Sequence, residues 1–189
     1  MNRHRPDDKR GTTAAARWSS DDAAISIGVS MGTEIERKFL VRAESWRAAA
    51  ADSRRLRQGY VAVDGQNTVR VRTDGEEAWL TVKGPQAGLA RAEFEYRIPR
   101  EDAEAMLGLC RGRLVEKVRH HVPAGGHVWE VDEFSGTNAG LVVAEIELDR
   151  ADEPFQTPEW VGDEVSGDPR YLNAQLSVRP YGSWGAADK

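Results

Sequence analysis

The stretch TEIERKFLV, from Thr33 to Val41, decides the fold. Read with a period of two, it places Glu34, Glu36 and Lys38 on one face of a β-strand and mostly apolar side chains on the other. In an ordinary half-buried strand, the apolar face is covered and the charged face is wet. The charged face of this strand therefore points either to bulk water or into a hydrated interior.

The same alternation recurs along the rest of the chain. Further runs with a period of two predict strands over residues 54–63, 67–73, 77–83, 89–98, 114–122, 127–134 and 141–149. Turn residues separate the early runs, with turns predicted at Asp64-Gly65, Asp74-Gly75 and Gly84-Pro85. Together with the first run, these segments predict a mainly β fold of the α+β kind with eight antiparallel strands.

Two short helices and a C-terminal tail complete the expected elements. Ser45 is a suitable N-cap for a helix over 45–52, and apolar residues at helical spacing predict a second helix over 101–109. The tail, residues 154–181, is expected to be loop with a short helix packed on the outside of the sheet.

The composition limits the class of protein. A chain of 189 residues predicts one domain, over 31–182, between a disordered N-terminal extension over 1–30 and a flexible C-terminus over 183–189. A formal net charge of -5 disfavours a general nucleic-acid binder, and no apolar run reaches the roughly 20 residues that span a bilayer. The single cysteine, Cys110, excludes a disulfide framework and fits a reducing cytosol. We therefore expect a cytoplasmic protein, as a monomer or a homodimer.

The charges are sorted by strand. Acids gather on some runs, as Glu34, Glu36, Glu130, Asp132, Glu145 and Glu147, and bases on others, as Arg70, Arg72, Lys83, Lys117 and Arg119. For any single strand, a face exposed to water is the commoner explanation. Exposed ion pairs contribute only about 0–1 kcal/mol, however, so stability gives little reason to sort the charges of a whole sheet. Eight strands can close into a barrel that holds one small ligand, and we expect a closed, tunnel-like barrel with a charged, hydrated lumen and a few helices outside.

The residue types indicate the ligand. Arginine and lysine side chains that converge from several strands suit a polyanion, because the guanidinium fork matches phosphate oxygens. Clustered carboxylates without cysteine suit a hard cation such as Mg²⁺ or Mn²⁺. The combination predicts a chain of phosphates chelated by a divalent metal.

Other side chains are interpreted as structural. Trp79, Trp129 and Trp160 are expected in the apolar outer layer of the barrel. His120 and His121 are neighbours on one strand, so their rings face opposite sides and do not form a joint metal site.

The charged runs resemble those of the CYTH domains, also called triphosphate tunnel metalloenzymes. The resemblance starts with Glu34-x-Glu36-x-Lys38 and continues in order through LRQGYV, VRVR, LTVKG, AEFEY, VEKVRH, WEVDEF, VAEIEL and DPRYLNAQL. It covers the chain from Met31 to Pro180 and is closest in kind to the short, single-domain bacterial branch. One departure concerns Leu172 and Ala174, which stand where some relatives carry lysines beside the asparagine.

The resemblance implies site residues as well as the tunnel fold. Catalytic roles are implied for Glu34, Glu36, Lys38 and Glu147, and metal ligation for Glu34, Glu36, Asp132, Glu145 and Glu147. Phosphate contacts are implied for Lys38, Arg70, Arg72, Lys83, Lys117 and Arg119. Further candidates are Tyr60, Glu93, Glu95 and Glu130, of which Glu93 and Glu95 alternatively orient the bases.

The implied activity is metal-dependent hydrolysis of the terminal phosphoanhydride of inorganic triphosphate, or of nucleoside and other organic triphosphates. Two alternatives stay open: an adenylate cyclase of class IV type, and a non-catalytic module that binds polyphosphate or nucleotides. The expected partner is a small-molecule triphosphate, without nucleic acid or membrane.

Overall fold

The computed structural model describes residues 29–75, 77–110 and 112–185, and most of the predicted N-terminal extension lies outside them. The strands are β1 (Val29–Val41), β2 (Asp52–Asp64), β3 (Asn67–Asp74), β4 (Glu77–Ala87), β5 (Ala90–Arg97), β6 (Leu114–Ala124), β7 (His127–Phe134), β8 (Val142–Glu147) and β9 (Val161–Glu164). The α-helices are α1 (Arg100–Leu109) and α2 (Asn173–Leu176), and the 3₁₀-helices are η1 (Glu44–Ala49), η2 (Gly136–Asn138), η3 (Pro169–Tyr171) and η4 (Tyr181–Ser183). None of the described helices is long and apolar enough to cross a membrane.

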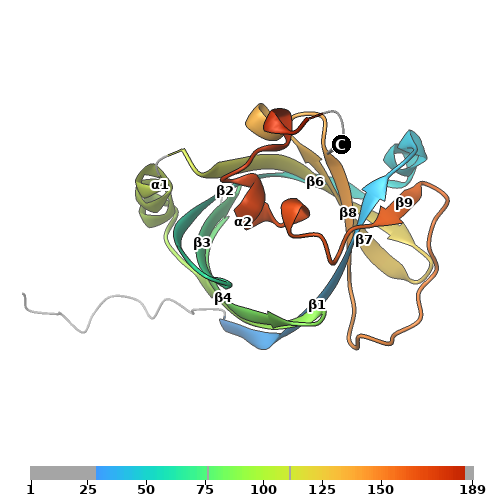
Figure 1. Cartoon of the computed structure of the whole chain (residues 1–189), viewed down its shortest axis with the longest axis horizontal. Helices are drawn as coiled ribbons and strands as arrows, with labels where there is room; N and C mark the ends of the chain where they lie inside the picture. The colour runs from blue at the N-terminus through green and yellow to red at the C-terminus, as the bar shows by residue number, and fades with distance from the viewer. Residues whose placement is uncertain (1–28, 76, 111, 186–189) are drawn as a thin grey trace, which may run out of the picture.

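Eight of the strands close into an antiparallel barrel. They are hydrogen-bonded in the order β5-β4-β3-β2-β6-β7-β8-β1, and β1 also pairs with β5. The first half of β1 pairs with β5 and its second half with β8, so this one strand closes the ring. The strands form a ring around the lumen in Figure 1. The predicted closed eight-stranded barrel is confirmed, and the short β9, which pairs with the end of β1, was not predicted.

The strand register directs the charged faces into the lumen. Residues that lie directly opposite one another on paired strands share a face of the sheet. Lys38 lies opposite Glu145, which in turn lies opposite Glu130 on β7. Arg119 lies opposite Asp132 in the same way. The charged sides of neighbouring strands therefore converge on one interior, as the alternation in the sequence predicted.

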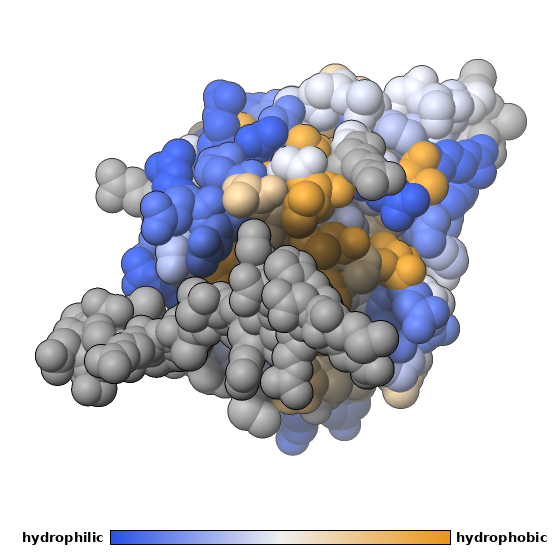
Figure 2. Space-filling view, turned by 90° about the vertical axis from the view of Figure 1, so that its left-hand side faces the viewer, coloured by the Kyte–Doolittle hydropathy of each residue, from blue (hydrophilic) through white to orange (hydrophobic). Residues whose placement is uncertain are grey.

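The outer face carries most of the apolar core. A buried cluster around Trp46 and Trp129 packs η1 and the loop that holds Trp160 onto β1, β6, β7 and β8. On the opposite side, the end of α1 packs closely against β2. Gly59 of β2 permits this contact, since a Cβ added there would lie only 2.6 Å from the sulfur of Cys110, the C-cap residue of α1. On the face of the molecule that Figure 2 shows, apolar surface lies next to charged surface.

The C-terminal tail occupies part of one end of the lumen, which corrects our expectation that the tail packs outside. Tyr171, Leu176 and Trp184 form a buried cluster with Val143 and with other apolar residues at the ends of β6, β7 and β8. Val143 shares the inner face with Glu145, two residues further along β8. The helix α2 accordingly lies within the ring of strands in Figure 1. We call Tyr171, Leu176 and Trp184 the C-terminal plug.

Two local predictions were wrong, and one residue of the predicted flexible C-terminus is buried. Ser45 lies inside η1, whose N-cap is Ala43, so it does not cap the helix. Gly84 and Pro85 form an irregularity within β4, and the turn follows at Gly88, whose φ is +66°. Trp184 is only 5% exposed, although we had assigned it to a flexible C-terminus.

Candidate active site

The lumen contains a cavity of about 580 Å³ that is lined by charged side chains. Its mouth lies at the β2–β3 and β4–β5 turns, where Gly65 and Leu89 contribute to the lining. The predicted residues that line it are Glu34, Glu36, Lys38, Tyr60, Arg70, Arg72, Lys83, Glu93, Glu95, Arg119, Glu130, Glu145 and Glu147. Every strand from β1 to β8 provides at least one of them, so the cavity depends on closure of the barrel.

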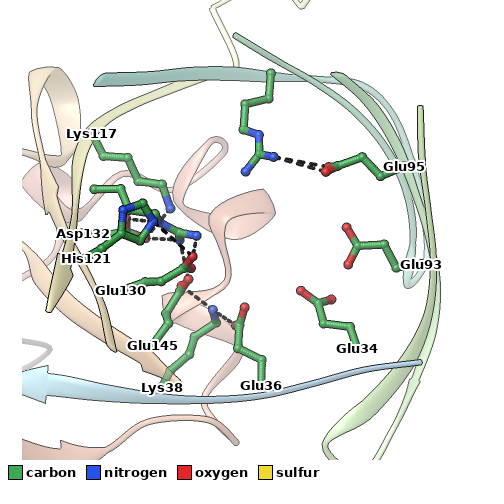
Figure 3. Close-up of polar contacts among 12 residues, drawn as sticks. Glu34, Glu36, Lys38, Glu93, Glu95, Lys117, His121, Glu130, Asp132 and Glu145 are labelled. Atoms are coloured by element: carbon green, nitrogen blue, oxygen red, sulfur yellow. Dashed lines mark hydrogen bonds and ion pairs between the residues drawn. The ribbon is translucent and has the colours of Figure 1, made fainter. Parts of the chain in front are cut away.

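On one side of the cavity, Lys38 lies between carboxylates of β1 and β8. Its ammonium group donates to the carboxylates of Glu36 and Glu145, and all three side chains point into the lumen in Figure 3. Burial by itself would lower the pKa of Lys38, but Glu145 and Glu36 outweigh it and raise that pKa. Lys38 is therefore a permanent cation at neutral pH.

The two carboxylates beside Lys38 differ in their acidity. Burial would raise the pKa of Glu145, but Lys38 and Arg119 hold it well below its usual value, and Arg119 donates to Glu145 at 2.5 Å. Burial and the neighbouring Glu145 charge raise the pKa of Glu36. One carboxylate is thus fixed as an anion, while the other accepts a proton more readily.

The opposite wall carries three further bases. Lys83 donates to Glu34 at 2.6 Å and lies 3.0 Å from Glu93. Arg70 and Arg72 both contact Glu95, at 3.4 and 3.2 Å. Glu93 and Glu95 are thus partners of bases, which is the alternative role that the sequence left open. Thr81 also donates to Glu95 at 2.7 Å, so the carboxylate between the two arginines is firmly placed.

Two predicted residues lie behind this lining. The side chains of Lys117 and Asp132 are 2% and 0% exposed, they pair with each other, and neither lines the cavity. Both oxygens of Asp132 also accept from Arg119, at 2.7 Å each. The structure therefore gives Asp132 the geometry of a support for Arg119, and places Lys117 away from a ligand in the cavity.

Negative charge is in excess around Glu147. No ion pair joins this residue to any other residue in the described part of the chain. Burial, and then the charges of Glu34 and other nearby glutamates, raise the pKa of Glu147. A bound cation would relieve this repulsion.

Comparison with known proteins identifies the family. The family model of the CYTH domain matches residues 32–181. The chain belongs to the CYTH family. The inorganic triphosphatase of Acetivibrio thermocellus is 46% identical over 152 residues, which cover 80% of this chain and 97% of that protein. The inorganic triphosphatase of Nitrosomonas europaea is 36% identical over 77% of this chain and 97% of its own. A crystal structure of an inorganic triphosphatase superimposes with a TM-score of 0.56 at 34% identity, covering 77% of this chain and 94% of that one.

The donor set of this CYTH tunnel fits the divalent metal that the family resemblance implies. Mg²⁺ and Mn²⁺ prefer carboxylate oxygens, and Glu34, Glu36 and Glu147 supply them on the lining. Within residues 29–75, 77–110 and 112–185, no three acidic or histidine side chains already form a metal site. Lys38 and Lys83 instead hold Glu36 and Glu34, so a metal would compete with these ammonium groups.

The CYTH tunnel also contains polar residues that we did not predict. Gln58 is completely buried and donates to the hydroxyl of Tyr60 at 3.3 Å, while its own carbonyl oxygen has no partner in the described part of the chain. Burial raises the pKa of Tyr60 to about 12, so this hydroxyl keeps its proton at neutral pH. Arg91 lines the cavity and donates to the backbone of Gly84 at 2.7 Å. The signal for Gln58 and Arg91 was the same period of two that identified their neighbours.

The C-terminal tail contributes to the CYTH site directly. Ser166 lines the cavity, and its hydroxyl accepts from the backbone nitrogen of Lys38 at 2.9 Å. Asn173 also lines the cavity, and its side-chain oxygen is buried without a partner among the described residues. The absence of flanking lysines at Leu172 and Ala174 therefore does not remove the tail from the site.

The raised pKa of Glu147 predicts a pH-dependent gain of stability in Glu147→Gln. Because the folded-state pKa lies above the usual 4.5, ionised Glu147 destabilises the metal-free fold as the pH rises through this range. Removing the charge should raise the melting temperature at pH 7, by no more than about 1 °C because the Glu147 side chain is exposed and its charge is screened by solvent. Below pH 4.5 both proteins carry a neutral group, so their melting temperatures should coincide.

Glu145→Gln is the matched comparison, because Glu145 is held as an anion by Lys38 and Arg119. It should lower the melting temperature at pH 7. Thermal melts of both variants in a chelator, from pH 4 to pH 8, test the pair, and a loss of stability in Glu147→Gln at pH 7 would contradict the assignment.

Proposed function

We propose that this CYTH protein is a metal-dependent inorganic triphosphatase, which hydrolyses the terminal phosphoanhydride bond of triphosphate inside the tunnel. The observation that carries the proposal is the cavity of about 580 Å³, which is lined by bases from five strands together with carboxylates. Two relatives of 46% and 36% identity with the name inorganic triphosphatase support the choice of substrate.

The bases supply what phosphoryl transfer requires from a protein. The reaction depends mainly on neutralising the phosphate oxygens and on placing the nucleophile in line. Arg70 and Arg72 lie on one strand with their guanidinium groups beside the same carboxylate, Glu95. Lys38 and Lys83 approach from β1 and β4. A triphosphate in the lumen would accept hydrogen bonds from these four bases. Its oxygens would replace the carboxylate oxygens that the bases contact in this structure.

The carboxylates would have two functions. Glu34 and Glu36 would hold Mg²⁺ or Mn²⁺, with Glu147 as a further ligand or as a base, and the metal when bound would neutralise charge on the phosphate oxygens. In the second role Glu147 would accept a proton from the attacking water, because it lines the cavity and no described base is paired with it. Glu145 remains an anion and keeps Lys38 and Arg119 in place.

Product analysis by phosphorus NMR tests the proposal. The full chain is incubated with tripolyphosphate, ATP or thiamine triphosphate, each with Mg²⁺ or Mn²⁺. We expect orthophosphate and pyrophosphate from tripolyphosphate, at a higher rate than hydrolysis of the other two substrates, and no product in a chelator. Pyrophosphate with a cyclic nucleotide from ATP would indicate a cyclase instead. Metal-dependent binding of tripolyphosphate without any product would indicate a binding module and would overturn the proposal.

A further inference from the structure

The main cavity leads to a second opening at the other end of the barrel. A smaller cavity of about 220 Å³ is lined there by Arg54, Asp74, Trp79 and His121, among others. The two cavities share four lining residues, Arg72, Glu95, Arg119 and Glu130. We call these four residues the neck, because they separate the main cavity from the second opening.

Trp79 lies in the lumen beside the neck, although we had expected it in the outer layer. On β4 it lies directly opposite Arg72 of β3, so the two side chains share the inner face. The guanidinium carbon of Arg72 is 4.9 Å from the centroid of the Trp79 ring. This distance is that of a cation–π contact.

Arg72 has few other anchors. Its Nη2 contacts Glu95 at 3.2 and 3.4 Å, which is long for an ion-paired hydrogen bond, and its buried Nε has no partner within the described ranges. Burial, together with the charges of Arg70 and Arg119, lowers the pKa of Arg72 to about 10. This guanidinium is therefore short of negative partners, and hydrogen bonds alone do not fix its orientation.

We propose that Trp79 is a positioning residue, whose indole face holds the Arg72 guanidinium in the neck and directs it toward the phosphate chain. This inference rests on the proposed function. The guanidinium carbon lies over the indole ring, and a cation–π contact of this kind leaves the N–H donors of an arginine available for phosphate oxygens. Trp79 itself contacts no substrate in this arrangement and acts through Arg72.

Kinetics of Trp79→Leu and Trp79→Phe test the inference. Loss of the ring should reduce kcat/KM for tripolyphosphate about tenfold, whereas phenylalanine keeps a ring and should stay within about threefold of the parent. Trp160→Leu is the matched control, because Trp160 belongs to the outer cluster and does not line either cavity. It should lower the melting temperature but leave KM and kcat unchanged.

A double-mutant cycle separates positioning from a general structural role. In an Arg72→Ala background, Trp79→Leu should cause no further loss of kcat/KM, because the residue acts through the missing guanidinium. An equal loss in both backgrounds would overturn the inference. A loss confined to ATP, with tripolyphosphate unaffected, would also overturn it, since the ring would then contact the base.

Binding measured by calorimetry distinguishes a failure of this inference from a failure of the proposed function. If the parent protein releases no product, the proposed hydrolysis fails, and the same cycle is measured as tripolyphosphate affinity. Weaker binding of Trp79→Leu only in the presence of Arg72 would support the inference. Unchanged affinity would overturn it.

Discussion

Lys38→Ala is expected to reduce kcat/KM for tripolyphosphate by at least about 100-fold, the usual effect of removing one preorganised charge at a reacting group. The ammonium group lies between Glu36 and Glu145 and is a permanent cation. Its loss removes positive charge from the site of phosphate binding and leaves two carboxylates side by side. Phosphate release, measured over a range of substrate concentrations, provides the test.

Arg37 provides a matched control for Lys38. It is the preceding residue on β1 but faces outward, where it pairs with Glu164 at 2.9 Å. Arg37→Ala should leave kcat/KM unchanged. Lys38→Ala should remain folded, because Arg119 still holds Glu145, and a thermal melt checks this. A folded Lys38→Ala protein with kcat/KM within about threefold of the parent would contradict the role of Lys38.

Asp132→Ala is expected to lower the free energy of unfolding by about 3–5 kcal/mol, the range measured when one member of a buried ion pair is removed. Asp132 is completely buried and pairs with both Lys117 and Arg119. Its removal leaves the buried Lys117 without a described acid partner, and burial already lowers the pKa of this lysine. Urea denaturation at neutral pH measures the loss.

The next residue on β7 gives the comparison. Glu133 faces outward and pairs with Arg47 at 2.7 Å, with both side chains well exposed, so Glu133→Ala should cost less than about 1 kcal/mol. Adding Lys117→Met to Asp132→Ala removes the unpaired cation and should restore part of the stability. A loss below about 1 kcal/mol in Asp132→Ala alone would show that the buried pair contributes little.

The sequence predicted which residues face the lumen, because a period of two determines the face of a strand. Glu34, Lys83 and Glu147 therefore lie where they were expected. The same period predicts Trp79 inside as well, since it is two residues from Thr81 and four from Lys83. The prediction that Trp79 lies in the outer layer is therefore wrong, and the register places this residue on the inner face.

Alternation does not determine the depth of a residue along the barrel axis. Lys117 and Arg119 are two residues apart on β6, yet only Arg119 reaches the cavity. The depth depends on strand tilt and on what fills each end of the lumen, and these follow from contacts between distant segments. The C-terminal plug is such a contact, because Leu176 packs against inward residues more than 30 positions earlier in the chain. No local pattern in the tail indicates whether it packs inside or outside.

The position of β1 has a consequence for biosynthesis. This strand leaves the ribosome before the rest of the barrel, but Glu36 pairs with Glu147 of β8, near the other end of the domain. The ring therefore cannot be sealed until nearly the whole domain has been translated. Pairings between such distant segments are slow to form, so the second half of β1 stays without its β8 partner until synthesis is almost complete.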